Sequence, residues 1–140
     1  MTASMHGGVV FRVHDELYFL PASIAMKVLP VPEMAIVPGG PVELCGVALV
    51  DGDMIPVVDV SDPPVLSDRP ERRELRPRRA GAMLVCTVLG ERVGFVGLDV
   101  VATGRYEVDA TGAVRLGHET AYAFDVAGMI ARVREGRWAV

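Results

Sequence analysis

The chain has 140 residues, of which 51% are apolar, and a formal net charge of −4 at pH 7. Such a length suffices for one domain with a sizeable core, because a chain of this size buries about two-thirds of the surface that it exposes when unfolded. No run reaches the ~20 consecutive apolar residues of a membrane-spanning helix, and residues 1–8 carry no export signal, so we expect a single cytoplasmic domain over residues 1–140 without membrane insertion.

The first predicted element is a β-hairpin near the N-terminus. Its strands are the short apolar runs at residues 9–13 and 17–20, and polar residues 14–16 separate them. Residues 22–28 are compatible with one helical turn or with a strand, and Pro30 stops either one. We expect a short helical turn that leads into a strand.

The most informative segment runs from residue 42 to residue 60. Two continuous apolar runs flank Asp51 and Gly52, and this is the strongest short-range signal of a hairpin, because Gly accepts a positive φ and Asp tolerates it. Continuous rather than alternating apolarity implies strands that are covered on both faces. Pro56 cannot donate a hydrogen bond to a neighbouring strand, so it should mark an edge or a bulge at which pairing ends and the chain leaves the sheet.

Residues 61–80 have four prolines, many charges and few large apolar residues, which predicts a mobile loop. The loop carries a cluster of arginines: Arg69, Arg72, Arg73, Arg76, Arg78 and Arg79. Closely spaced arginines bind phosphates, so a small β-barrel that binds nucleic acid through this segment is the alternative function. No aromatic residue interleaves the arginines to stack on bases, which favours a solvated linker.

The second half of the chain repeats the strand-turn-strand pattern. We expect a hairpin from residues 82–89 and 93–101, another hairpin over residues 108–114, a strand at residues 121–126 and a short terminal helix at residues 128–133. With four such signals and no long amphipathic helix, the chain is predicted to be mainly β. Two small barrels fit better than one sandwich.

The sequence offers no arrangement for catalysis. Its three histidines show no metal-ligand spacing, its serines and cysteines lack a nucleophile context, and its glycines fit neither a dinucleotide nor a P-loop motif. Cys45 and Cys86 lie in apolar runs, where free buried thiols are favoured over a disulfide. We therefore expect no catalytic residues, no metal, no cofactor and no enzymatic activity.

The order of motifs resembles the CheW family, which includes the regulatory domain of the kinase CheA and the amino-terminal domain of CheV. The resemblance covers about residues 9–133. The matching segments are VVFRV at 9–13, ELYFLP at 16–21, MKVLP at 26–30, CGVAL at 45–49, Gly52, MIPVVDV at 54–60, GERVG at 90–94, LDVV at 98–101 and AFDV at 123–126. The central segments, from residue 45 to residue 60, are the specific part.

This resemblance implies two five-stranded SH3-like barrels that share one core and end in a short helix. It also implies a non-enzymatic scaffold of a bacterial chemosensory system, located in the cytoplasm and associated with receptor clusters. Its partners would be a receptor cytoplasmic tip, which is a helical hairpin, and the regulatory domain of a CheA-type histidine kinase. Family members take the receptor tip into an apolar groove between the barrels.

The resemblance also implies which residues bind the partner. The residues that match the groove and its surroundings are Ala25, Lys27, Val28, Val47, Asp51 and Val85. For the apolar members of this set, ordinary core packing is the alternative.

The chain departs from the family pattern at three places. Asp51 stands where an arginine is usual, and Lys27 stands where an acid is common. Because a charge reversal at a contact can be worth several kcal/mol, the two changes bear on partner choice and could compensate each other. The stretch from residue 103 to residue 122 is also shorter than usual. These departures indicate a divergent adaptor that has lost or replaced one partner.

Overall fold

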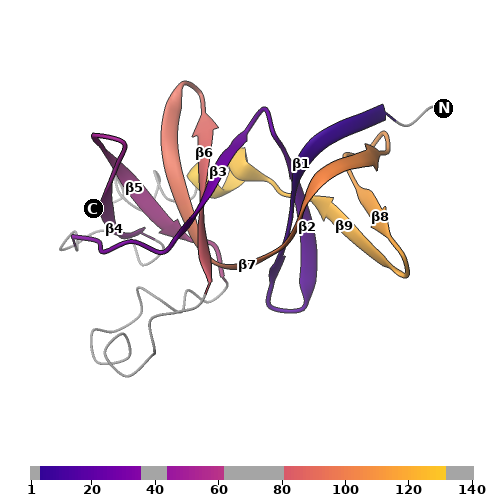
Figure 1. Ribbon diagram of the computed structural model, residues 1–140, viewed down its shortest axis with the longest axis horizontal. Coiled ribbons are helices and arrows are strands. Elements are labelled where there is room, and N and C mark those ends of the chain that lie inside the picture. The colour runs from indigo at the N-terminus through magenta and orange to yellow at the C-terminus, as the bar shows by residue number, and fades with distance from the viewer. Residues whose placement is uncertain (1–3, 36–43, 62–80, 132–140) are drawn as a thin grey trace.

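A computed structural model describes residues 4–35, 44–61 and 81–131 of the chain (Figure 1). These residues are mainly β, as predicted, with a helix at residues 126–131. The strands are β1 (Ser4–Val13), β2 (Glu16–Pro21), β3 (Ala25–Pro30), β4 (Leu44–Val50), β5 (Asp53–Asp59), β6 (Ala82–Val88), β7 (Glu91–Val108), β8 (Val114–Leu116) and β9 (Glu119–Ala123).

Five strand segments close into a first barrel, which we call barrel A. Strand β1 pairs with β2, β2 with β9 in parallel, β9 with β8, and β8 with the end of β7. The second half of β7, from Asp99 to Val108, returns to pair with β1 and closes the ring. Closure gives each strand of barrel A a partner on both sides, which protects the sheet from pairing with another chain.

The second barrel, barrel B, contains β3, β6, the first half of β7, β5 and β4. The ladder runs from β3 to β6, then to β7, then to β5 in parallel, and finally to β4. Ala35 and Val47 exchange two backbone hydrogen bonds of 2.9 Å, so the segment after β3 closes this barrel against β4.

Strand β7 belongs to both barrels and runs between them (Figure 1). It changes partner from β6 to β1 between Leu98 and Asp99, next to Gly97, which has a φ of +84°. A Cβ atom at Gly97 would lie 2.1 Å from an oxygen of Asp59, a fully buried carboxylate that accepts hydrogen bonds from the backbone N–H and the hydroxyl of Ser61. The positive φ and the adjacent buried carboxylate therefore favour a glycine at this position.

Replacing Gly97 by alanine is expected to lower the free energy of unfolding by about 2–3 kcal/mol. The strain of a left-handed backbone conformation at alanine and the steric clash of its Cβ atom with Asp59 add together. Gly52→Ala is the matched control: Gly52 also has a positive φ, +86°, but a Cβ atom at that position would meet no described atom within 4 Å. The control should lose only about 1 kcal/mol. Urea unfolding of both variants measures the difference, and equal losses would contradict the clash.

One apolar core lies between the barrels and joins them. It combines side chains of β1 and β2 with side chains of β3, β5, β6 and β7, and the helix adds Val126 and Met129. Smaller clusters fill each barrel separately. Phe124 packs against the shared core and makes edge-to-face contacts with Phe11 and Phe95, at ring-centroid distances of 5.2 and 6.0 Å. The two barrels are thus one packed unit.

Several predicted elements differ in detail from the structure. Residues 22–24 form a turn and the strand begins at Ala25, so little of the expected helical turn is present. Strand β9 ends at Ala123, where the prediction extended it to residue 126. Strand β5 does not leave the barrel at Pro56: that residue pairs with Val47, and the strand continues to Asp59.

Pro56 is accommodated for a local reason. Pairing of β5 with β7 begins only one residue later, and the register shift of the β4–β5 ladder lies nearby, between Leu44 and Gly46. A missing N–H is tolerated at such an interruption.

Candidate docking surface

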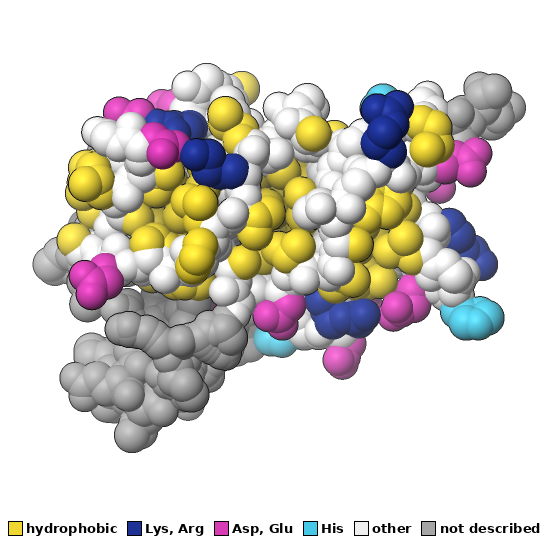
Figure 2. Space-filling model, viewed as in Figure 1, with side chains coloured by type: hydrophobic (Ala, Val, Ile, Leu, Met, Phe, Trp, Pro, Cys, Tyr) yellow, Lys and Arg dark blue, Asp and Glu magenta, His cyan; other side chains and the backbone are white. Residues whose placement is uncertain are grey.

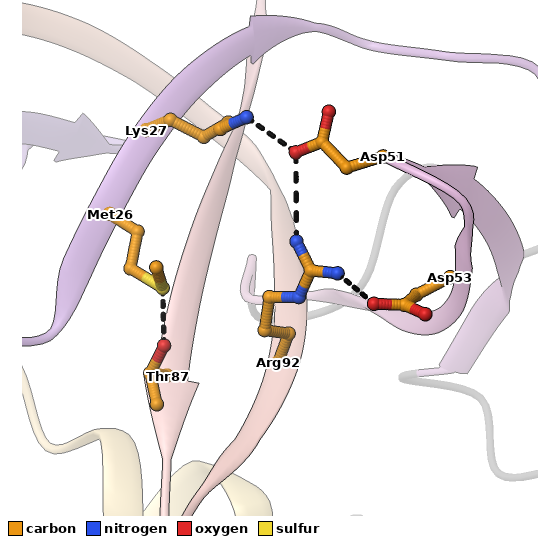
Figure 3. Close-up of polar contacts among 6 residues, drawn as sticks. All are labelled: Met26, Lys27, Asp51, Asp53, Thr87 and Arg92. Carbon is orange, nitrogen blue, oxygen red and sulfur yellow. Dashed lines mark hydrogen bonds and ion pairs between the residues drawn. The ribbon is translucent and has the colours of Figure 1, made fainter.

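Four charged side chains meet at one end of barrel B (Figure 3). Lys27 on β3 donates to Asp51 over 2.6 Å. The guanidinium of Arg92, at the start of β7, lies 3.6 Å from the same oxygen of Asp51, and its other terminal nitrogen contacts Asp53. We call these four residues the charge network. It connects β3, the β4–β5 turn and β7.

The turn between β4 and β5 places both carboxylates. Val50 pairs with Asp53, so the hairpin has a two-residue loop in which Asp51 and Gly52 have φ values of +51° and +86°. Such a loop matches the twist of its strands and demands residues that tolerate positive φ. The predicted Asp-Gly hairpin is confirmed.

Charge pairing shifts the acidity of one member of the network. The hydrogen bond from Lys27 is the main cause that lowers the pKa of Asp51 below its ordinary value of 3.8, and the charges of Lys27 and Arg92 act in the same direction. A carboxylate whose pKa is lower in the folded than in the unfolded protein stabilises the folded state at pH values above its unfolded-state pKa. That contribution is lost as the pH falls through its folded-state pKa. The contacts that Asp51 makes should therefore be intact at neutral pH and should be lost only below about pH 4.

Replacing Lys27 by methionine is expected to raise the pKa of Asp51 toward its ordinary value, because the principal donor is removed. Carboxyl carbon NMR across an acid titration measures the change. Asp109 is an internal control: its pKa is also lowered, chiefly by the hydroxyl of Thr111, and should not respond. An unchanged titration of Asp51 would show that Lys27 does not pair with it in solution.

Beside the charge network, the outer face of the β4–β5 hairpin is apolar. Leu49 pairs with Met54, and Val47 pairs with Pro56. We call these four residues the apolar strip. Leu49 is 65% exposed and Met54 is 60% exposed. In Figure 2 apolar side chains gather on the face over β3, β4 and β5, with charged side chains along its upper margin.

Four of the six residues predicted to bind a partner are accessible at the surface of barrel B. Lys27 and Asp51 contact each other, Val47 belongs to the apolar strip, and Val28 is 38% exposed on β3. We define the docking surface as the apolar strip, the charge network and Val28.

The other two predicted residues are core residues. Ala25 is 7% exposed and packs in the shared core. Val85 is completely buried in the core of barrel B, so the prediction that it lines a groove is wrong. For Val85, the alternative of core packing holds.

Sequence reasoning missed Leu49, Met54, Asp53 and Arg92 as residues of this surface. The two-residue Asp-Gly turn fixes the register of its strands, and that register could have identified Leu49 and Met54 as a cross-strand pair. No local signal could have identified Arg92, because 39 residues separate it from Asp53.

The remaining predictions about sites concern absences and the arginine segment. Within the described residues, no three side chains are grouped to hold a metal. Cys45 and Cys86 are both buried, as expected, and burial raises the pKa of Cys86 to about 12. The arginine cluster at residues 69–79 and almost all of the predicted loop at residues 61–80 lie outside the described residues.

One hollow of about 390 Å³ lies elsewhere, on barrel A. It is lined by His6, Phe19, Leu20, Pro21, Ser23, Ile24, Val108, Gly112, Ala123 and Phe124. None of the six predicted binding residues lines it. No helix in the described part of the chain is long and apolar enough to cross a membrane.

Comparison with known proteins gives a consistent result. A model of the CheW-like domain matches residues 7–122. Among solved structures, the scaffolding protein TtCheW from Thermoanaerobacter tengcongensis is similar, with a TM-score of 0.64 and 17% sequence identity over 90% of each chain. At this identity the likeness concerns the fold. Curated proteins give no match. The chain belongs to the CheW-like domain family.

Proposed function

We propose that this protein is a non-enzymatic adaptor of a bacterial chemosensory system, which couples a receptor to a CheA-type histidine kinase. The observation that carries the proposal is the exposed apolar strip beside a fixed charge network on a rigid barrel. Partner docking buries a few well-placed apolar anchors, and Leu49 and Met54 have the exposure and the mutual support that such anchors need.

The receptor would present its helical hairpin tip to the docking surface. A helix contributes an apolar face with side chains at regular spacing, and a pair of exposed cross-strand side chains can pack between successive turns of such a face. Val28 on β3 would extend the contact beyond the hairpin.

The reversed charges support a specialised adaptor. Asp51 and Lys27 depart in sign from the residues usual in the family, and in this chain they form a pair with each other at 2.6 Å. The reversal is thereby compensated within the chain. A receptor whose surface complements the usual signs would meet the opposite arrangement here, so we propose that one of the two usual partners has been replaced or lost.

The adaptor would act as one domain over residues 1–140, in the cytoplasm, at receptor clusters. The shared core supports the single domain, because neither barrel keeps its apolar interior covered without the other.

Calorimetric titration tests the proposed function. The purified protein is titrated separately with a receptor cytoplasmic fragment and with the regulatory domain of the kinase from the same organism. We expect binding to at least one, and binding to one alone would identify which partner has been replaced. Absence of binding to both, together with salt-sensitive binding to an oligonucleotide, would instead favour the arginine segment and a nucleic-acid function.

A further inference from the structure

Arg92 occupies a particular position in the docking surface. One terminal nitrogen faces Asp51 and the other contacts Asp53, so a single guanidinium joins the carboxylates on both sides of Gly52. The planar fork of arginine suits two acceptors at once, whereas a lysine ammonium is a point charge on a flexible stem. Arg92 is also the least exposed member of the network, with 24% of its side chain accessible.

Arg92 is placed so that it can hold the tip of the β4–β5 hairpin in a fixed position. Arg92 pairs with Thr87 in the β6–β7 ladder, so its backbone is fixed. The tip of the β4–β5 hairpin, in contrast, projects beyond the last strand pair, Val50 and Asp53. Leu49 and Met54 are the next pair in the ladder. A change in the angle of the tip would therefore displace the apolar strip.

The network is also electrically balanced. It contains two cations, Lys27 and Arg92, and two anions, Asp51 and Asp53, and the charges alternate in sign from one end of the network to the other. A balanced network attracts no charged partner surface on average. Removing the charge of Arg92 would leave one excess negative charge next to the apolar strip.

We propose that Arg92 is a positioning residue of the docking surface: it fixes the β4–β5 tip so that Leu49 and Met54 are presented to a helical receptor segment, and it keeps that surface neutral. This inference rests on the proposed function. The inference implies that the face of the receptor segment that contacts the β4–β5 tip is apolar and carries no net charge.

Two variants distinguish the positioning effect of Arg92 from the effect of its charge. Arg92→Gln removes both effects. Arg92→Gln combined with Asp53→Asn restores neutrality, because Lys27 and Asp51 remain as a balanced pair, but it does not restore the link from β7 to the tip. Arg12→Gln is the matched control, since Arg12 forms a partly exposed ion pair with Glu119 on barrel A, at 3.5 Å and away from the docking surface.

The probe is the receptor cytoplasmic fragment, and binding is measured at several salt concentrations. Arg92→Gln is expected to bind about fivefold more weakly and to change the dependence of affinity on salt. The double variant should recover the wild-type salt dependence but not the affinity. Wild-type binding by Arg92→Gln, or full recovery of affinity by the double variant, would overturn the positioning role.

Hydrogen exchange on the free protein tests the same inference without a partner. Backbone amides of residues 50–53 should exchange faster in both Arg92 variants than in the wild-type protein and in Arg12→Gln. Unchanged exchange at the tip would overturn the inference. A wild-type protein that binds no receptor fragment would count against the proposed function, and the exchange result would still decide whether Arg92 fixes the tip.

Discussion

Replacing Phe11 by alanine is expected to destabilise both barrels together, by about 3–5 kcal/mol. Phe11 is completely buried in the shared core, where its ring contacts Tyr18 and Phe124 at centroid distances of 5.9 and 5.2 Å. Its removal leaves a cavity at the junction of the barrels. Native-state hydrogen exchange should show a similar loss of protection in β2 of barrel A and in β6 of barrel B.

Phe11→Leu is the conservative comparison, because leucine retains much of the buried volume. It should cost about 1 kcal/mol or slightly more. If Phe11→Ala lowered protection in β2 while β6 kept its wild-type exchange, the barrels would unfold independently, and the shared core would not couple them.

Replacing Leu49 by aspartate is expected to weaken binding of the receptor fragment by at least about tenfold, because a charge then stands within the apolar strip. Leu49 is 65% exposed, so the fold should tolerate the change with little loss of stability. Calorimetry with the receptor fragment measures the affinity, and a thermal melt confirms that the variant is folded.

Met5→Asp is the matched control for this experiment. Met5 is an apolar residue on β1 with 55% exposure, and it lies on barrel A. The control variant should bind the receptor fragment as the wild-type protein does. Equal affinities for Leu49→Asp and the wild-type protein would exclude the apolar strip from the interface.

Much of the fold could be predicted because its signals are local. The hairpin at Asp51 and Gly52 requires positive φ at both turn residues, and that requirement is visible in two adjacent letters of the sequence. The turn at Leu89 and Gly90 likewise separates two apolar runs. The parallel pairing of β2 with β9 has no local signal, because it joins segments far apart in the sequence, such as Leu17 and Ala121.

The docking surface could be predicted only in part for the same reason. Lys27 and Asp51 were identified through the family resemblance, although their contact spans 24 residues of sequence. Val85 was misassigned because an apolar residue in a doubly covered strand has no alternation to show which face it occupies. Arg92 lies next to a turn, where a charged residue is ordinarily explained by exposure alone.

The most direct test of the proposed docking surface is an NMR titration of the isotope-labelled protein with the receptor cytoplasmic fragment. We expect the largest chemical-shift changes at Val28, Leu49 and Met54 and at the amides of the β4–β5 turn. Shift changes confined to barrel A, for example around the hollow near Phe19, would contradict this docking surface and would place the receptor on the other barrel.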